Sequence, residues 1–174
     1  MKADVVALNS YVFDRTRRRL DGLTDAEYLW EPAPGCWTIR PRTGGVWSAD
    51  GPSGQATGPL TTIAWRLWHL IGCYGSPRNA EWLGSEWASA GDLSPCPTAK
   101  AALGTLERSA EWWAALLESL TDEQLELPLG PVAGTFAEST RASFVLHQID
   151  EQIHHGAEIG VLRDLYSALG IERR

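Results

Sequence analysis

The chain has 174 residues but only three cysteines, two lysines and one methionine. The cysteines, Cys36, Cys73 and Cys96, are odd in number, and no two of them have the spacing of a CxxC motif. This excludes a complete disulfide framework and a cysteine zinc knuckle. We therefore expect reduced thiols and a cytoplasmic location.

Long apolar runs are also missing. No stretch reaches the roughly 18 apolar residues that a membrane-spanning helix needs, and the first residues lack the apolar segment of a secretory signal. The formal net charge of −7 disfavours nucleic acid or an anionic membrane as the main partner, because either would be repelled. We expect a soluble protein that binds neither nucleic acid nor membrane.

Apolar residues are nevertheless sufficient for one core, since 44% of the chain is hydrophobic. We predict a single domain over residues 1–174. Helical periodicity and capping residues predict four long helices, over residues 3–22, 62–74, 98–120 and 139–159. The last pattern extends to residue 169, either continuing the helix or kinking it after Gly160. The predicted fold class is all-α, a four-helix bundle.

Residues 31–60, between the first two helices, contain five prolines and many glycines, which predicts a long irregular insertion. Within it, residues 37–40 and 46–49 alternate as two short strands would. Residues 78–97 are predicted to be a loop with at most a short helix. We interpret Trp65, Trp68, Trp112 and Trp113 as core residues, and Trp37 and Trp47 as candidates for lining a pocket.

Three of the four histidines fall within nine residues, from 147 to 155, in a helical pattern. Because a helical turn takes about 3.6 residues, one side of this helix carries a polar stripe. Its members are His147, Glu151, His154, His155 and Glu158. The fourth histidine, His69, lies in another apolar helical segment, where a buried imidazole needs a polar partner. The clustering indicates a divalent metal site shared by two helices.

The spacing of these residues limits the choice of metal ligands but does not decide it. Glu151 and His155 are four residues apart, so a helix presents both to one point, and His69 would complete a His₂Glu set. Such sets occur in catalytic zinc sites that keep a fourth position open. However, His147 and Glu151 have the same spacing, and Glu151 and His154 are three residues apart.

Three further side chains near these positions have candidate roles. Asp150 and Glu158 are candidate acceptors for the second ring N–H of a metal-bound histidine. Cys73 follows His69 by four residues and could approach the ion, but we interpret it as a buried, inert thiol.

The sequence resembles the DinB/YfiT-like superfamily of four-helix metal-binding proteins. The resemblance lies in residues 22–27 (GLTDAE), 62–70 (TIAWRLWHL) and 152–158 (QIHHGAE), and it spans nearly the whole chain. Members commonly hold a divalent ion, often zinc or nickel, with one histidine of the second helix and two of the last. By position, the resemblance implies that the metal ligands are His69, Glu151 and His155, with glutamate replacing the usual middle histidine.

The His, Glu, His set is similar to that of mycothiol-dependent maleylpyruvate isomerase. Residues 36–41 resemble a branch seen largely in actinobacterial proteins, in which mycothiol is the expected low-molecular-weight thiol. These resemblances imply a thiol S-transferase or isomerase that uses Zn²⁺, or else Ni²⁺, and acts on a small electrophile. Arg40, Arg42 and Arg66 are candidates for neutralising a substrate carboxylate.

Two other functions are open at this point. One is a metal-dependent hydrolase in which His154 or Glu158 accepts a proton, and the other is a non-catalytic stress-response protein with a structural ion. Apolar helix faces in this family often pair, which implies a homodimer.

Overall fold

The computed structural model describes residues 1–51 and 60–171. Within these ranges the long helices are α1 (Lys2–Arg19), α3 (Ile63–Gly75), α5 (Ala99–Ser119) and α7 (Arg141–Ala168). The short α-helices are α2 (Asp25–Tyr28), α4 (Pro77–Trp82) and α6 (Asp122–Glu126). The 3₁₀-helices are η1 (Thr43–Gly45) and η2 (Pro131–Phe136), and the strands are β1 (Ile39–Pro41) and β2 (Trp47–Ala49). The prediction of a mainly helical protein is confirmed.

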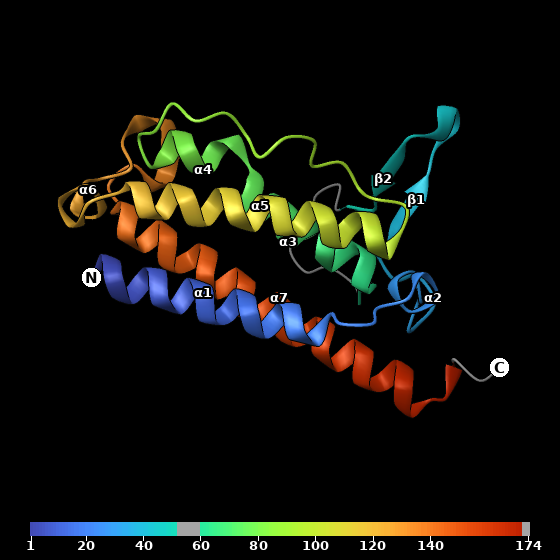
Figure 1. The fold of residues 1–174 in the computed structure, drawn as a ribbon. Coiled ribbons are helices and arrows are strands. Elements are labelled where there is room, and N and C mark those ends of the chain that lie inside the picture. Colours follow the sequence, from blue (N-terminus) through green and yellow to red (C-terminus); the bar gives the residue numbers. More distant parts are fainter. Residues whose placement is uncertain (52–59, 172–174) are drawn as a thin grey trace.

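The four long helices are arranged so that each contacts two of the others, in a closed ring. Helix α1 lies beside α7, α7 packs on α3, α3 packs on α5, and α5 contacts α1 (Figure 1). Trp113 of α5 is fully buried in the core between them, as predicted. Its indole N–H donates to Asn9 Oδ1 at 2.9 Å, so the polar atom of this large side chain keeps a partner.

Threonine side chains set the start of the long helices. Thr62, Thr98 and Thr140 each accept a hydrogen bond from the backbone N–H three residues later, before α3, α5 and α7. The predicted starts of α3 and α5 are confirmed, and α7 begins within two residues of its predicted start. Thr121 and Gln124 form a capping box before α6.

Helix α7 does not kink after Gly160 but continues to Ala168. The glycine lies in close contact with the Arg19 side chain instead. Arg19 of α1 donates through Nη2 to the carbonyl of Gly160 at 2.7 Å, and a Cβ at this position would lie 3.2 Å from Arg19 Nε. A glycine that is typical of a helix end therefore lies inside a continuous helix and leaves room for Arg19 of α1.

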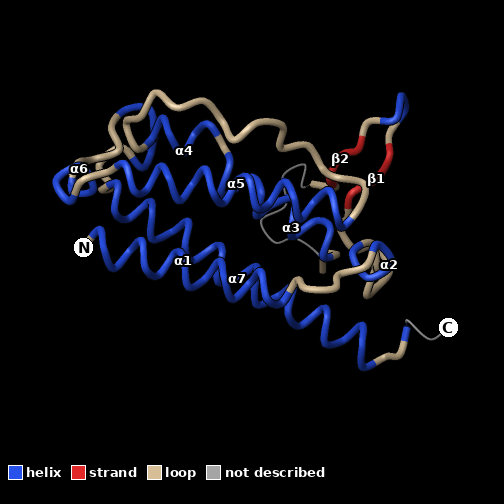
Figure 2. The backbone as a smooth tube through the Cα atoms, viewed as in Figure 1, coloured by secondary structure: helices blue, strands red, loops and turns tan. Residues whose placement is uncertain are grey.

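The insertion contains the predicted hairpin, with Ile39 opposite Ala49 in an antiparallel pair (Figure 2). Gly44 and Gly45 in its turn have φ values of 83° and 78°, which favour glycine. A parallel bridge from Trp37 to Thr61 ties the insertion to the start of α3. Residues 52–59 of the predicted irregular segment lie outside the described residues. The predicted loop over 78–97 begins with α4.

Across residues 1–51 and 60–171, no helix combines the length and the apolar character needed to cross a bilayer.

Gly75, at the end of α3, gives the first testable prediction. A Cβ there would lie 2.8 Å from Leu93 Cδ2 and 2.8 Å from Ser109 Oγ. We expect Gly75→Ala to lower the free energy of unfolding by about 1–3 kcal/mol, because added atoms do not fit a dense core. Gly72→Ala is the matched control, since a Cβ there meets nothing within 4 Å. Urea denaturation measures both, and equal stability of the two variants would contradict the packing.

Candidate metal centre

Helices α3 and α7 bring the three sequence-predicted ligands together across 82 residues of chain. His69 Nε2, on α3, lies 3.2 Å from Glu151 Oε2 on α7. His155 Nε2 lies 3.0 Å from the same oxygen. The two imidazole rings have their centroids 4.7 Å apart. Both histidines therefore meet at one carboxylate oxygen.

Among the described residues, two groups of three side chains place donor atoms within 4.8 Å of one another. One group is His69, Cys73 and Glu151, and the other is His154, His155 and Glu158. The sequence-predicted set takes members from both groups. Glu151 links them, because its Oε2 contacts a histidine of each.

The centre is closed on one side and open on the other. The side chain of His155 is 8% exposed, whereas those of His69 and Glu151 are 34% and 28% exposed. Trp65 stacks on the His69 ring with centroids 5.3 Å apart and an interplanar angle of 8°. One imidazole is thus fixed in the interior, and the other two groups face a route from solvent.

The protonation states favour a cation. Burial lowers the pKa of His69, which keeps its imidazole neutral. Burial by itself would raise the pKa of Glu151, but the hydrogen bond with His69 and the charge of His155 outweigh it, and this pKa is lowered. A neutral imidazole and an ionised carboxylate are the forms that bind metal.

Glu158 and Arg66 both contact Nδ1, the second ring nitrogen of His155. Glu158 Oε2 lies 2.7 Å from His155 Nδ1, as the sequence led us to expect of an acceptor for the second ring nitrogen. Arg66 Nη2 donates to Glu158 Oε1 at 3.1 Å. Burial would raise the pKa of Glu158, yet the hydrogen bond with His155 and the charge of Arg66 lower it. Asp150, the other acceptor candidate, is exposed.

Cys73 of α3 lies beside the centre. It is buried, as predicted, but its sulfur belongs to the group with His69 and Glu151. Burial raises the pKa of Cys73 to about 12, so the thiol is protonated unless a cation is bound. Its four-residue spacing from His69 was the signal for this placement.

His147 and His154 lie at the rim of the centre, with side chains 61% and 62% exposed. His147 Nε2 is 3.9 Å from Glu151 Oε1, and His154 Nε2 is 3.2 Å from Glu158 Oε1. Each contacts a carboxylate of the centre from the solvent side.

The three arginines considered for a substrate carboxylate already have carboxylate partners. Arg40 contacts Glu31 and Asp50, Arg42 contacts Asp50, and Arg66 contacts Glu158. Of the two tryptophans expected near a pocket, both are half-buried. The Trp37 ring packs 5.7 Å from Trp65, the ring that stacks on His69.

The family model that describes the DinB superfamily matches residues 10–159 of the sequence. This range runs from α1 into α7 and includes His69, Glu151 and His155. The comparisons found no matching curated protein and no matching solved structure. Because the family model covers most of the 174 residues, the chain belongs to the DinB superfamily.

Proposed function

We propose that this protein holds one divalent metal ion, Zn²⁺ or else Ni²⁺, through His69, Glu151 and His155. The supporting observation is the double contact of Glu151 Oε2, 3.2 Å from one imidazole nitrogen and 3.0 Å from the other. Two imidazoles and a carboxylate form a donor set that suits zinc. The same donors also serve nickel, since imidazole and carboxylate bind several divalent metals.

The neighbours of these ligands suit the role. Glu158 contacts the second nitrogen of His155 and would accept its N–H when Nε2 is a ligand, which helps to orient the ring. Trp65 holds the plane of His69 by stacking. When bound, Zn²⁺ lowers the pKa of a coordinated thiol or water.

The proposed reaction is thiol S-transfer or isomerisation, with a low-molecular-weight thiol such as mycothiol and a small electrophile. An external thiol suits the chain because two of its own three thiols, Cys36 and Cys73, are buried and so are not open to a substrate in solution. The thiol sulfur would form a bond to an electrophilic carbon. In isomerisation this bond breaks again and releases the thiol, whereas in transfer a leaving group departs with its electron pair.

Turnover tests this function directly. We expect zinc-loaded protein to convert maleylpyruvate or a chlorinated aromatic only when mycothiol is present, and chelator-treated protein to be inactive. Glutathione and bacillithiol complete the panel of thiols. A panel without any metal-dependent turnover would refute the reaction.

The rim of the centre favours a hydrolase as the second candidate. His154 is accessible and contacts Glu158, so the pair could accept a proton from water. Hydrolysis of esters or amides without a thiol, and its loss in His154→Ala, would separate this function from thiol transfer. If the ion is structural and the protein is not catalytic, removal of the ion should lower the melting temperature and affect no reaction.

We also propose that the long helices form a DinB-type four-helix bundle and that two copies pair through α7. An exposed apolar row supports pairing, since Leu146, Ile153 and Val161 are 51%, 36% and 66% exposed on one side of the helix. We expect light scattering to give a dimer mass, and Val161→Arg to give a monomer. Val46→Arg, at an equally exposed valine outside α7, should stay dimeric. A monomeric unmodified protein would contradict the pairing.

A further inference from the structure

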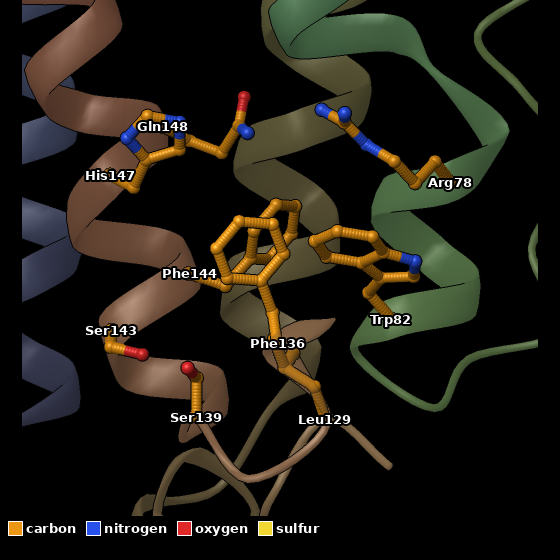
Figure 3. A pocket seen from close by; sticks show the side chains of 9 residues that line it. All are labelled: Arg78, Trp82, Leu129, Phe136, Ser139, Ser143, Phe144, His147 and Gln148. Atoms are coloured by element: carbon orange, nitrogen blue, oxygen red, sulfur yellow. The ribbon is translucent and has the colours of Figure 1, made fainter. Parts of the chain in front are cut away.

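A second pocket lies beside the first turns of α7, before the metal centre along that helix. A cavity of about 240 Å³, open on one side, is lined by residues of α4, η2 and the first half of α7 (Figure 3). Aromatic rings line it, with the Trp82 centroid 5.0 Å from Phe144 and 6.2 Å from Phe136. Pockets for drug-sized ligands measure roughly 300–1,000 Å³, so this one suits a single small ring.

Arg78 brings a positive charge to these rings. Its guanidinium carbon lies 5.2 Å from the Trp82 centroid and 5.7 Å from the Phe144 centroid. Unlike Arg40, Arg42 and Arg66, Arg78 has no ion pair with a carboxylate in residues 1–51 and 60–171. Stacking on aromatic faces leaves the N–H edge of a guanidinium available, and that edge matches a carboxylate.

Gln148 supplies a buried polar group at the same end of the cavity. Its side chain is 1% exposed, and Oε1 has no hydrogen-bond partner among the described residues. Figure 3 shows its amide on the side of Arg78, with Ser139 and Ser143 at the opposite end. A buried amide oxygen without a partner costs free energy, and only a ligand group that donates a hydrogen bond would relieve this cost. The amide also carries N–H donors that suit a carboxylate.

His147 connects this polar end to the metal centre. Its ring lines the cavity, and its Nε2 lies 3.9 Å from Glu151 Oε1. Along α7, His147 and Gln148 come one turn before Glu151, whereas Ser143 comes two turns before it. A carboxylate beside Arg78 would therefore lie at the end of the cavity nearer the centre.

We propose that this cavity binds a small aromatic carboxylate, with the ring between Trp82, Phe136 and Phe144 and the carboxylate on Arg78 and Gln148. Binding stands on the cavity alone. The further step, that the electrophilic substrate of the enzyme is itself a small aromatic carboxylate, rests on the proposed function.

Calorimetric titration with benzoate tests the site. The full chain is first freed of metal by chelation, so that the carboxylate has no ion to bind. We expect saturable binding of benzoate, at least about tenfold weaker binding in Arg78→Gln, and a similar weakening for the neutral analogue benzyl alcohol. Arg15→Gln is the matched control, because Arg15 also lies over an aromatic ring, 5.6 Å from the Tyr11 centroid on α1. It should bind benzoate as the unmodified protein does.

The outcomes separate this proposal from the reaction. No benzoate binding, or equal binding by the unmodified protein and Arg78→Gln, overturns the site. Equal affinity for benzyl alcohol overturns carboxylate recognition. Benzoate binding without metal-dependent turnover refutes the reaction and leaves the site standing, whereas turnover without benzoate binding refutes the site alone.

Discussion

Glu151→Gln is expected to abolish stoichiometric zinc binding and to leave the protein folded. Glu151 Oε2 contacts both His69 and His155, so the variant removes the negative charge at the meeting point of the ligands. Loss of a partner that only orients a ligand already weakens metal binding roughly 10–100-fold, and loss of a ligand should exceed this. Elemental analysis after dialysis should give about one zinc per unmodified chain and far less in the variant.

Asp150→Asn is the matched control for this prediction. Asp150 precedes Glu151 on α7 and is exposed, so the variant makes the same change of charge without touching the centre. It should keep its zinc. Circular dichroism establishes that both variants are folded, and a folded Glu151→Gln protein with a full equivalent of zinc would contradict the ligand assignment.

Either Cys73 or His155 could be the third ligand beside His69 and Glu151, and a Cys73 variant distinguishes the two. Its sulfur lies within 4.8 Å of donor atoms of His69 and Glu151, so it competes with His155 for the third position. We assign that position to His155, which contacts Glu151 directly at 3.0 Å and is supported by Glu158. Cys73→Ala should therefore retain zinc, while His155→Ala should lose it. The reverse result would move the site to the group with the thiol.

The sequence could predict which residues share a helix face but not what that face meets. Spacing placed His147, Glu151 and His155 on one side of α7, and only the family resemblance chose among them. Their meeting with His69 depends on the packing of α3 on α7, which no local pattern encodes. The same limit explains Arg66, whose partner Glu158 lies 92 residues away.

Arg78 was missed for a different reason. It follows Pro77 directly, in a stretch predicted to be a loop, and its proposed role depends on the aromatic rings that it stacks on. One of these rings, Phe144, lies on α7, so it becomes a neighbour only when the fold is complete. Helix starts were predictable because a threonine cap acts within three residues, whereas a ligand cavity needs several segments at once.

Glu27 shows how a local pattern can be correct in part. The spacing from Thr24 predicts a capping box, and Thr24 Oγ1 does accept a hydrogen bond from the Glu27 N–H. The Glu27 carboxylate, however, turns away and binds Arg163 of α7, with Nε to Oε1 at 2.8 Å and Nη2 to Oε2 at 3.1 Å. Arg163 Nη1 also donates to the carbonyls of Arg19 and Asp21. One guanidinium thus fastens the last turns of α7 to the α1–α2 connection.

Replacing Arg163 by leucine is expected to destabilise the fold more than any surface change. The Glu27 side chain is 3% exposed, so the variant would leave a buried carboxylate without a counterion, which costs about 3–5 kcal/mol. The double variant Glu27→Leu/Arg163→Leu should recover most of this loss, because an apolar pair needs no charge compensation. Arg17→Leu, which breaks an exposed pair with Glu107, should cost less than about 1 kcal/mol. Urea denaturation compares the three, and an Arg163→Leu protein as stable as Arg17→Leu would show that the buried pair does not hold α7 in place.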